Sequence, residues 1–579
     1  METRYTLLTL LFAAIASGCA LAADQAASLD GIWEFAFRED VALEEAGGAE
    51  FAATDVMPVP GCWDVMPKWH LKHGTGLYRR EFTLGAPMKD AVLVVDGMGI
   101  RARFEVDGRD LGTHPYPYAR LEIPVGPLEA GRHVVFAAVD NVMEWPRVKL
   151  ARPYYDFYFY GGFYHGVKLA EREPKVFVRT LDYRTGKIEV EVEGASESTA
   201  MIAFDGGAET DVKLSGGRIV VAVPHYRLWS PESPALHKVS IKLSTFQPFS
   251  FSTRFGIRQV EARDGKIYLN GKEVFLKGFN RHESSPLEGA ATGEATMLRD
   301  LQNLKSVGGN FIRGAHYQQT ERFLDLCDEM GVLVWEESLG WGNGQGYTNG
   351  KFPPNELSDG EFCELQVRQT REMVRASFNH PSVVLCGFLN ECNSARQDCR
   401  QLVDRLVGTI RAERSGRLVT FAANVIEGDI CCTNVDVVSF NAYPGTIPMH
   451  PGTPGQLMAK VRERFDGAVK LFRERYPDKP IVVSESGCGG MYGVHDPGAS
   501  INTEEFQDEY LTCILETLWA NPDVSGYSIW QMNDGRTRER FCEQDCSAMF
   551  GGSIAGCFDA MRRPKRSVAT VRRYFNMKP

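Results

Sequence analysis

The chain has 579 residues, of which 24% are charged and 44% hydrophobic, and its formal net charge is −11. That length exceeds one ordinary domain, so three or four domains are expected. An acidic chain has no surplus of basic residues to neutralise phosphates, which argues against a nucleic-acid partner or an anionic membrane surface. The composition is that of a globular protein and by itself selects no substrate.

The first residues have the features of an export signal. Arg4 precedes a short apolar run, residues 7–16. Ala20-Leu21-Ala22 then forms a small-residue cleavage site, so residues 1–23 are predicted to be a signal peptide of a secreted or periplasmic protein. No stretch reaches about 18 apolar residues, so no membrane span is expected. An alternative cut before Cys19 resembles a lipoprotein box, and would make the protein an outer-membrane lipoprotein with its lipid anchor at Cys19.

Two stretches of short alternating strands follow. Residues 24–170 combine runs such as AVLVVDGMGIRARFEVDGRDLG with Asp-Gly turns, which are strong hairpin signals, and predict a jelly-roll β-sandwich. Residues 171–258 again contain short strands, such as KIEVEVEG and HKVSIKLST, over a shorter length. This second stretch predicts an immunoglobulin-like β-sandwich.

Residues 259–579 change to apolar strands that alternate with helices. Parallel strands covered on both faces are apolar throughout, as in NFIRGAHY, VLVWEES, VVLCGFLNE and PIVVSESG. The pattern contains eight such strands and about seven helices, which predicts a (β/α)8 TIM barrel. The fifth unit lacks a clear helix.

The cysteines give no sign of a metal site. The chain has 14 of them, and export would allow disulfides, for which Cys392–Cys399 and Cys542–Cys546 are close enough in sequence. Connectivity does not follow from sequence alone. Because the cysteines lack the paired spacing of a zinc site, we expect no metal and no other cofactor.

The active site of a (β/α)8 barrel is built at the C-terminal ends of its strands. Seven of the eight predicted strands end on polar or aromatic residues: Asn280, Arg281, His282, Glu283, Arg313, His316, Glu336, Glu337, Asn390, Glu391, Asn441, Tyr443, Ser484, Glu485, Trp530, Asn533 and Asp534. Carboxylates, amides and aromatic rings, without a glycine-rich phosphate loop or a lysine for a Schiff base, are typical of carbohydrate chemistry.

Glycoside hydrolysis needs two carboxyl groups that flank the scissile bond. Glu391 ends the fourth strand and Glu485 the seventh, across the barrel mouth. A separation of about 5 Å would give retention of configuration through a covalent glycosyl intermediate. Tyr443 is placed to hydrogen-bond the nucleophile, Asn390 to hold the sugar 2-hydroxyl, and Trp530 to stack on a pyranose ring.

Several of these residues also have a purely structural interpretation. Glu336 and Glu337 are favoured as ion-pair partners of the arginines that end the first two strands. His282 and His316, taken singly, fit core histidines whose hydrogen bonds are satisfied. The tryptophan of the eighth strand fits barrel packing, and Asp534 fits a loop cap.

The motifs LNGKEVFLKGFNRHE, FIRGAHY, GFLNE, SFNAY and VVSESG, in this order, resemble glycoside hydrolase family 2, which contains β-galactosidases, β-glucuronidases and β-mannosidases. SLDGIWEFAF, VPGCWD and DFYFYGGFYHGVKL extend the resemblance over nearly the whole mature chain. It implies that Glu391 is the proton donor and Glu485 the nucleophile. The resemblance further implies that the terminal sugar contacts Asp156, His316, Asn390, Asn441, Tyr443 and Trp530. The family often forms dimers or tetramers, so a homo-oligomer is compatible with the resemblance, and the oligomeric state is left open.

The departures from the family pattern bear on the sugar. Glucuronidases carry an N-x-K triplet that holds the substrate carboxylate, and here the triplet is Ser553-Ile554-Ala555. The loss of this charge-assisted partner would cost on the order of 1.5–3 kcal/mol, unless Arg536, Arg538 or Arg540 replaces it. The Glu and His residues of the metal-using galactosidases are also missing.

The sequence therefore predicts a retaining exo-β-glycosidase that needs no divalent ion. β-Galactosidase is the first expectation, with β-glucuronidase or another family 2 exo-β-glycosidase as the alternative. A catalytically inactive carbohydrate-binding protein is the main rival of another class. The presence of both Glu391 and Glu485 argues against that rival, because decay of an active site usually removes one of them.

Overall fold

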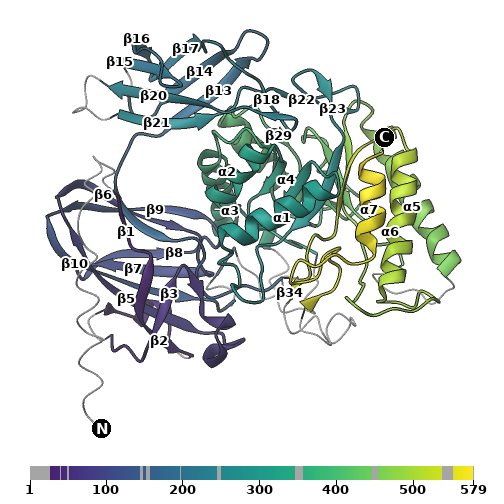
Figure 1. Ribbon diagram of the computed structural model, residues 1–579, viewed down its shortest axis with the longest axis horizontal. Coiled ribbons are helices and arrows are strands. Elements are labelled where there is room, and N and C mark those ends of the chain that lie inside the picture. The colour runs from purple at the N-terminus through teal and green to yellow at the C-terminus, as the bar shows by residue number, and fades with distance from the viewer. Residues whose placement is uncertain are drawn as a thin grey trace.

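The computed structural model describes residues 26–39, 41–48, 51–143, 148–150, 157–195, 197–243, 250–345, 356–445, 454–537 and 552–577. The predicted signal peptide, Cys19, Asp156, Arg538, Arg540, Cys542 and Cys546 lie outside these described residues. Two all-β parts lie beside a barrel that is surrounded by helices α1 to α7 (Figure 1). Multidomain β plus TIM-barrel architecture is thus confirmed, while the predicted domain limits stay predictions.

Two antiparallel sheets form the jelly roll. One has the order β3 (Asp55–Val59), β2 (Gly31–Arg38), β5 (Thr75–Leu84), β10 (Gly131–Asp140), β7 (Arg101–Val106), β8 (Arg109–His114). The other has the order β1 (Ala26–Ser28), β12 (Val167–Glu171), β6 (Met88–Asp96), β9 (Arg120–Leu128). Alternate residues of both sheets face a shared core that includes Trp33, Tyr78 and Phe163.

The immunoglobulin-like part is one continuous antiparallel sheet. Its order is β13 (Val176–Asp182), β14 (Lys187–Val192), β17 (Arg218–Ala222), β16 (Thr210–Ser215), β15 (Glu197–Phe204), β20 (His237–Leu243), β21 (Ser250–Phe255). The end strands β13 and β21 contact each other, so the sheet curls around a core of aliphatic residues such as Ile188, Val190 and Val239.

The barrel strands are all parallel. They are β25 (Leu276–Arg281), β26 (Phe311–Gly314), β27 (Leu333–Glu337), β28 (Val383–Gly387), β29 (Leu418–Val419), β30 (Ala422–Ala423), β31 (Val438–Asn441), β32 (Ile481–Glu485) and β33 (Val524–Ile529). The sheet runs from β29 through β28 and β33 round to β30. Since β29 and β30 are two halves of one run of chain, the fifth strand closes the ring.

The barrel helices are α1 (Glu294–Ser306), α2 (Glu321–Met330), α3 (Gly360–Ala376), α4 (Gln397–Ala412), α5 (Pro454–Arg475), α6 (Glu504–Ala520) and α7 (Ser567–Phe575). Asp359 caps α3 and Thr503 caps α6, each accepting a backbone N–H of the first turn. Residues 424–437, all of them described, form no helix, as expected for the fifth unit. Within the described part of the chain, no helix combines the length and the apolar character that a bilayer crossing requires.

Both β parts are fixed to the barrel by buried contacts. At the N-terminal ends of the barrel strands, Trp229 joins the core that contains Trp335, and Arg258 donates to the carbonyls of Pro381 (3.1 Å) and Val383 (2.8 Å). The small sheet β22 (Val260–Arg263), β23 (Lys266–Leu269), β24 (Lys272–Glu273) covers the same end of the barrel. At the opposite end, the rings of Tyr118 from the jelly roll and Tyr317 from the barrel stack at 3.6 Å.

We expect Trp229→Ala to loosen the contact between the immunoglobulin-like part and the barrel. The Trp229 side chain is fully buried and its indole N–H donates to the carbonyl of Asp328 at 2.9 Å. Truncation of such a side chain lowers the free energy of unfolding by about 3–5 kcal/mol. Thermal and urea midpoints should both fall, whereas Val220→Ala, at a position 46% exposed, should change neither. Equal midpoints for the two variants would contradict this assignment.

Candidate active site

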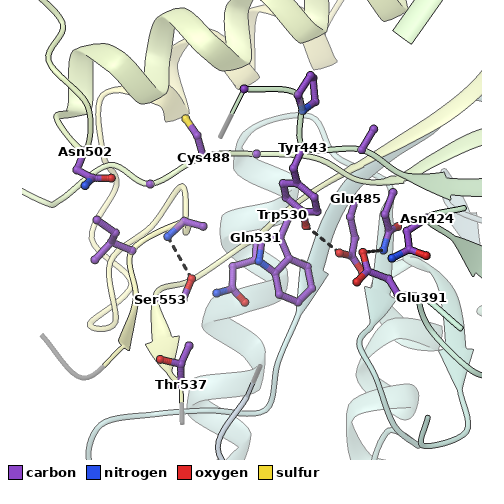
Figure 2. A pocket seen from close by; sticks show the side chains of 18 of the residues that line it. Glu391, Asn424, Tyr443, Glu485, Cys488, Asn502, Trp530, Gln531, Thr537 and Ser553 are labelled. Carbon is purple, nitrogen blue, oxygen red and sulfur yellow. Dashed lines mark hydrogen bonds between the residues drawn. The ribbon is translucent and has the colours of Figure 1, made fainter. Parts of the chain in front are cut away.

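A cavity of about 1410 Å³ opens at the C-terminal ends of the barrel strands (Figure 2). Pockets that enclose a small ligand occupy about 300–1,000 Å³, so this one has room for a sugar and part of its aglycone. Among the residues that line it are Glu391, Asn424, Asn441, Tyr443, Glu485, Trp530, Gln531, Arg536 and Ser553. Five of the predicted site residues therefore line one cavity: Glu391, Asn441, Tyr443, Glu485 and Trp530.

The turn after β28 directs Glu391 into this cavity. Leu389 and Glu391 both have left-handed backbone conformations, with φ of 47° and 53°, which are unfavourable for residues other than glycine. Hydrogen bonds hold the turn: Asn390 N donates to Gly340 O at 2.9 Å, and Glu391 N donates to Ala422 O at 2.8 Å. Strained backbone that neighbouring elements hold in place is typical of functional sites. The strained turn leaves Asn390 fully buried and Glu391 at the cavity wall.

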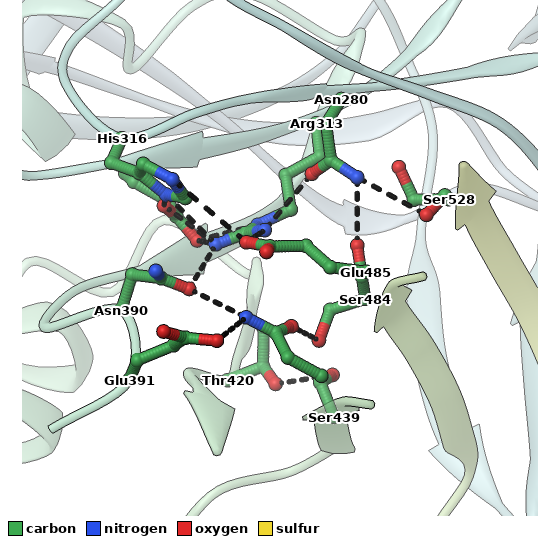
Figure 3. Close-up of polar contacts among 12 residues, drawn as sticks. Asn280, Arg313, His316, Asn390, Glu391, Thr420, Ser439, Ser484, Glu485 and Ser528 are labelled. Carbon is green, nitrogen blue, oxygen red and sulfur yellow. Dashed lines mark hydrogen bonds and ion pairs between the residues drawn. The ribbon is translucent and has the colours of Figure 1, made fainter. Parts of the chain in front are cut away.

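The buried guanidinium of Arg313, at the end of β26, is the centre of the polar network (Figure 3). It donates to Glu485 Oε1 (2.5 Å) and Asn390 Oδ1 (2.9 Å), and its Nε donates to Glu337 Oε1 (2.8 Å). Burial disfavours the charge, but Glu337 and Glu485 outweigh it and raise the pKa of Arg313 above its ordinary value. Arg313 thus stays charged and fixes both the candidate nucleophile and the neighbour of the candidate acid.

A second set of hydrogen bonds holds Glu391 through Asn441 and Glu485 through Tyr443. Its Nδ2 donates to Glu391 Oε1 at 3.0 Å and to Asn390 Oδ1 at 3.1 Å, while its Oδ1 accepts from Ser484 Oγ at 2.7 Å. Tyr443 OH donates to Glu485 Oε2 at 2.8 Å. Each oxygen of Glu485 therefore has a donor, which holds its carboxylate in one orientation.

Trp530 and His282 line the cavity, and the fully buried His316 packs against Trp530. The His316 ring stacks on Trp530 with centroids 5.3 Å apart, and the His282 ring meets Trp530 edge-on at the same distance. Burial lowers the pKa of His316 to about 3 and that of His282 well below its usual range, so both rings are neutral near pH 7. His316 Nδ1 lies 3.2 Å from Arg313 Nη2, while Nε2 lies 3.8 Å from Glu485 Oε1 and has no hydrogen-bond partner among the described residues. His316 is therefore not a core histidine whose hydrogen bonds are all satisfied.

For Glu336, Glu337 and Asp534, the structure agrees with the predicted structural role at two of the three positions. Glu337 pairs with Arg313, and burial raises the pKa of Glu337 to about 6 against the effect of this arginine. Glu336 instead accepts from the backbone N–H of Gln319, and no ion pair within the described ranges involves it, so that expectation is wrong. Asp534 accepts from Gly556 N at 2.9 Å and pairs with a lysine at 2.7 Å, as a loop cap would.

The cavity is also lined by residues that were not predicted from the sequence, among them Asn424 and three aromatic residues. Asn424 directly follows β30, so the strand-end rule applied to LVTFAAN would have found it. Phe157, Tyr158 and Tyr160 reach the cavity from the jelly roll, next to Asp156, which lies outside the described residues. The signal that could have found them is their segment, DFYFYGGFYHGVKL, whose first residue is expected from the family resemblance to contact the sugar.

The described residues contain one group of possible metal ligands. Asp325, Asp328 and His380 place ligand atoms within 4.8 Å of one another, but His380 Nδ1 and Asp328 Oδ2 are hydrogen-bonded at 2.6 Å and Asp325 pairs with Arg254. These contacts account for the cluster as structural. Cys392 and Cys399 are both free, buried thiols.

Comparisons with known proteins show the family of this chain and similar folds. The family model for glycosyl hydrolases family 2, TIM barrel domain, matches residues 260–578. A β-glucuronidase of Streptococcus agalactiae serotype V is 25% identical over 602 aligned residues, covering 95% of this chain and 97% of that protein. A β-galacturonidase from Eisenbergiella tayi, solved with bound galacturonate, is 28% identical with a TM-score of 0.82, covering 96% of this chain and 97% of that one. A β-glucuronidase from Ruminococcus gnavus, 23% identical with a TM-score of 0.83, shares the fold.

We expect Tyr443→Phe to lower kcat/KM about 10- to 100-fold, because a hydrogen bond to a charged group is worth about 1.5–3 kcal/mol. The variant loses the donor to Glu485 Oε2 and keeps the ring. Steady-state hydrolysis of a nitrophenyl glycoside measures the effect. Tyr492→Phe is the control, since Tyr492 is 40% exposed and packs under Arg563 outside the cavity. If both variants keep wild-type rates, Tyr443 does not act on the carboxylate.

Proposed function

Because the chain belongs to glycosyl hydrolase family 2, we propose that it is a retaining exo-β-glycosidase that releases a terminal β-linked hexuronic acid. The main support for the proposed catalysis is that Glu391 and Glu485 line one cavity. A chain of hydrogen bonds through Asn441, Asn390 and Arg313 connects the two carboxylates. Two carboxyl groups on either side of a glycosidic bond are the requirement for this chemistry.

In the proposed mechanism, Glu391 protonates the leaving oxygen while Glu485 attacks the anomeric carbon. The C–O bond to the leaving group breaks, and a covalent bond forms between the sugar and a Glu485 oxygen. Glu391, now ionised, removes a proton from water, and that water displaces Glu485 from the sugar. Arg313 and Tyr443 hold the two Glu485 oxygens, and Asn441 holds Glu391.

An exo mode of action fits the contribution of the jelly roll. Phe157, Tyr158 and Tyr160 line the cavity together with residues of the barrel strands. Bulky side chains on the jelly-roll side of the cavity favour a chain end, over the middle of a glycan chain, at the catalytic pair. The polar side chains around Glu391 and Glu485 would then bind one terminal sugar.

The choice of a uronic acid as the sugar is supported by the relatives. The alignment with a β-glucuronidase covers 95% of this chain. The β-galacturonidase of Eisenbergiella tayi, which was solved with bound galacturonate, has the same architecture as this chain. β-Galactosidase, the first expectation from the sequence, has less support than the alternative. Ser553-Ile554-Ala555 still places no amide or ammonium in the wall. A neutral galactoside is therefore the second candidate.

A panel of nitrophenyl β-glycosides tests the glycone. We expect turnover of the β-galacturonide or the β-glucuronide to exceed that of the matched β-galactoside and β-glucoside, because only the uronides carry a carboxylate. Initial rates at several concentrations give kcat/KM for each sugar. Preference for the galactoside would replace the uronide with the second candidate, and absence of turnover on every sugar would favour a carbohydrate-binding protein.

Variants of the two carboxylates test their roles. Glu485→Gln should lose at least about 10³-fold in kcat on every substrate, since the attacking group is removed. Glu391→Gln should lose about 10²–10⁴-fold with alkyl leaving groups, which need a proton, and much less with dinitrophenolate, which does not. Rates across a leaving-group series measure both effects. Glu361→Gln, at an exposed position of α3, serves as the control. Full activity of Glu485→Gln would show that Glu485 is not the nucleophile and that the proposed mechanism is wrong.

A further inference from the structure

The proposed substrate carries a carboxylate for which the Ser553-Ile554-Ala555 segment offers no cation. Three basic side chains line the cavity within the described ranges: Lys460, Arg464 and Arg536. Lys460 is exposed on α5, and Arg464, on the same helix, pairs with Glu427. Arg536 differs from both, because no ion pair joins it to a carboxylate among the residues that the structure describes.

Arg536 lies directly beside the wall that the triplet position forms. It belongs to β34 (Gly535–Arg536), which pairs antiparallel with β35 (Gly552–Ser553), so that Gly535 lies opposite Ser553 and Arg536 opposite Gly552. β34 follows β33 and Trp530 closely in the chain. Figure 2 shows Gln531 and Ser553 on the far side of Trp530 from Glu391 and Glu485. The hairpin thus brings a guanidinium to the wall that lacks the triplet cation.

The jelly roll holds the guanidinium of Arg536 in place. Its central carbon lies 5.1 Å from the ring centroid of Tyr158 and 5.7 Å from that of Tyr160. Its Nη1 donates to the backbone carbonyl of Asp64 at 3.4 Å. Tyr160 is itself fixed, since its hydroxyl forms a 2.8 Å hydrogen bond with Ser284 Oγ. An arginine oriented in this way loses little conformational freedom when it binds an anion.

The hydrogen bonds of Arg536 leave donors for a ligand. A guanidinium carries five N–H groups, and the carbonyl of Asp64 takes one of them in the part of the chain that the structure describes. Arg536 is only partly buried and lines the cavity, so the remaining donors have access to it. The fork geometry of these donors matches the two oxygens of a carboxylate.

We propose that Arg536 binds the carboxylate of the terminal hexuronic acid and so takes the place of the missing triplet. This inference rests on the proposed uronidase function. Arg536 contacts the substrate in this assignment, whereas Tyr158 and Tyr160 act as positioning residues. The selectivity for an acidic sugar then depends on a barrel arginine that is oriented by the jelly roll.

Arg536→Gln tests the assignment through a ratio of rates. We expect kcat/KM for the nitrophenyl β-uronide to fall about 10- to 100-fold, because a charge-assisted hydrogen bond is lost. Turnover of the matched neutral β-glycoside should stay within about threefold, so the uronide-to-neutral ratio falls. Arg536→Lys should be intermediate, since it keeps the charge without the fork. Tyr160→Leu should lower the same ratio by less than Arg536→Gln does.

Arg263→Gln is the matched control. Arg263 also lies over a tyrosine ring, Tyr268, at 4.1 Å, but it belongs to the small sheet that covers the opposite end of the barrel. Its variant should keep the wild-type ratio. Where neutral glycosides turn over too slowly to measure, inhibition of uronide turnover by free galacturonate and by free galactose provides the same comparison.

The possible failures are distinguishable. If the wild-type protein hydrolyses no uronide, the proposed function is wrong and the role of Arg536 is wrong with it. If the wild type hydrolyses uronides but Arg536→Gln lowers both substrate classes equally, or neither, only the assignment of Arg536 is overturned. Thermal unfolding of each variant shows whether a loss on both substrates comes from misfolding.

Discussion

The site depends on one buried charge, the guanidinium of Arg313. A cation without solvent is tolerated only where anions and acceptors surround it. Here Glu337, Glu485 and Asn390 supply them from three other barrel strands or the turns that follow them. Replacement of any one partner would remove an acceptor from a guanidinium that has no water to replace it. The same contacts that make the charge tolerable fix the orientation of the candidate nucleophile, so stability and catalysis use one set of hydrogen bonds.

Asn390 and Asn441 extend this constraint to the other carboxylate. Both amides bridge groups that would otherwise be independent, since Asn390 accepts from Arg313 and from Asn441, which in turn donates to Glu391. The amide oxygen of Asn390 is satisfied by these two donors, whereas its buried Nδ2 has no hydrogen-bond partner among the described residues. The left-handed backbone at Leu389 and Glu391 is acceptable because bonds to Gly340 and Ala422 hold the turn.

The two β parts have different relations to the barrel. The immunoglobulin-like part meets the end away from the catalytic pair, through Trp229 and Arg258, and contributes to stability. The jelly roll instead reaches the cavity itself, where its tyrosines meet Arg536. A change in the sugar that the barrel accepts can therefore arise from a loop of another domain. Under the proposed role of Arg536, a departure at the triplet does not by itself exclude an acidic substrate.

The sequence alone determined the architecture and predicted five of the residues that line the cavity. Eight apolar strands with polar ends are visible in the periodicity, and Glu391 and Glu485 follow from the strand-end rule, because period and strand position are local properties. Only the tertiary structure decided which partners these residues have. Glu337 meets Arg313 while Glu336, one position away, faces the opposite side of the sheet and does not. The place of Arg536 beside Tyr158 and Ser553 also required the fold, since these residues come together from segments far apart in the sequence.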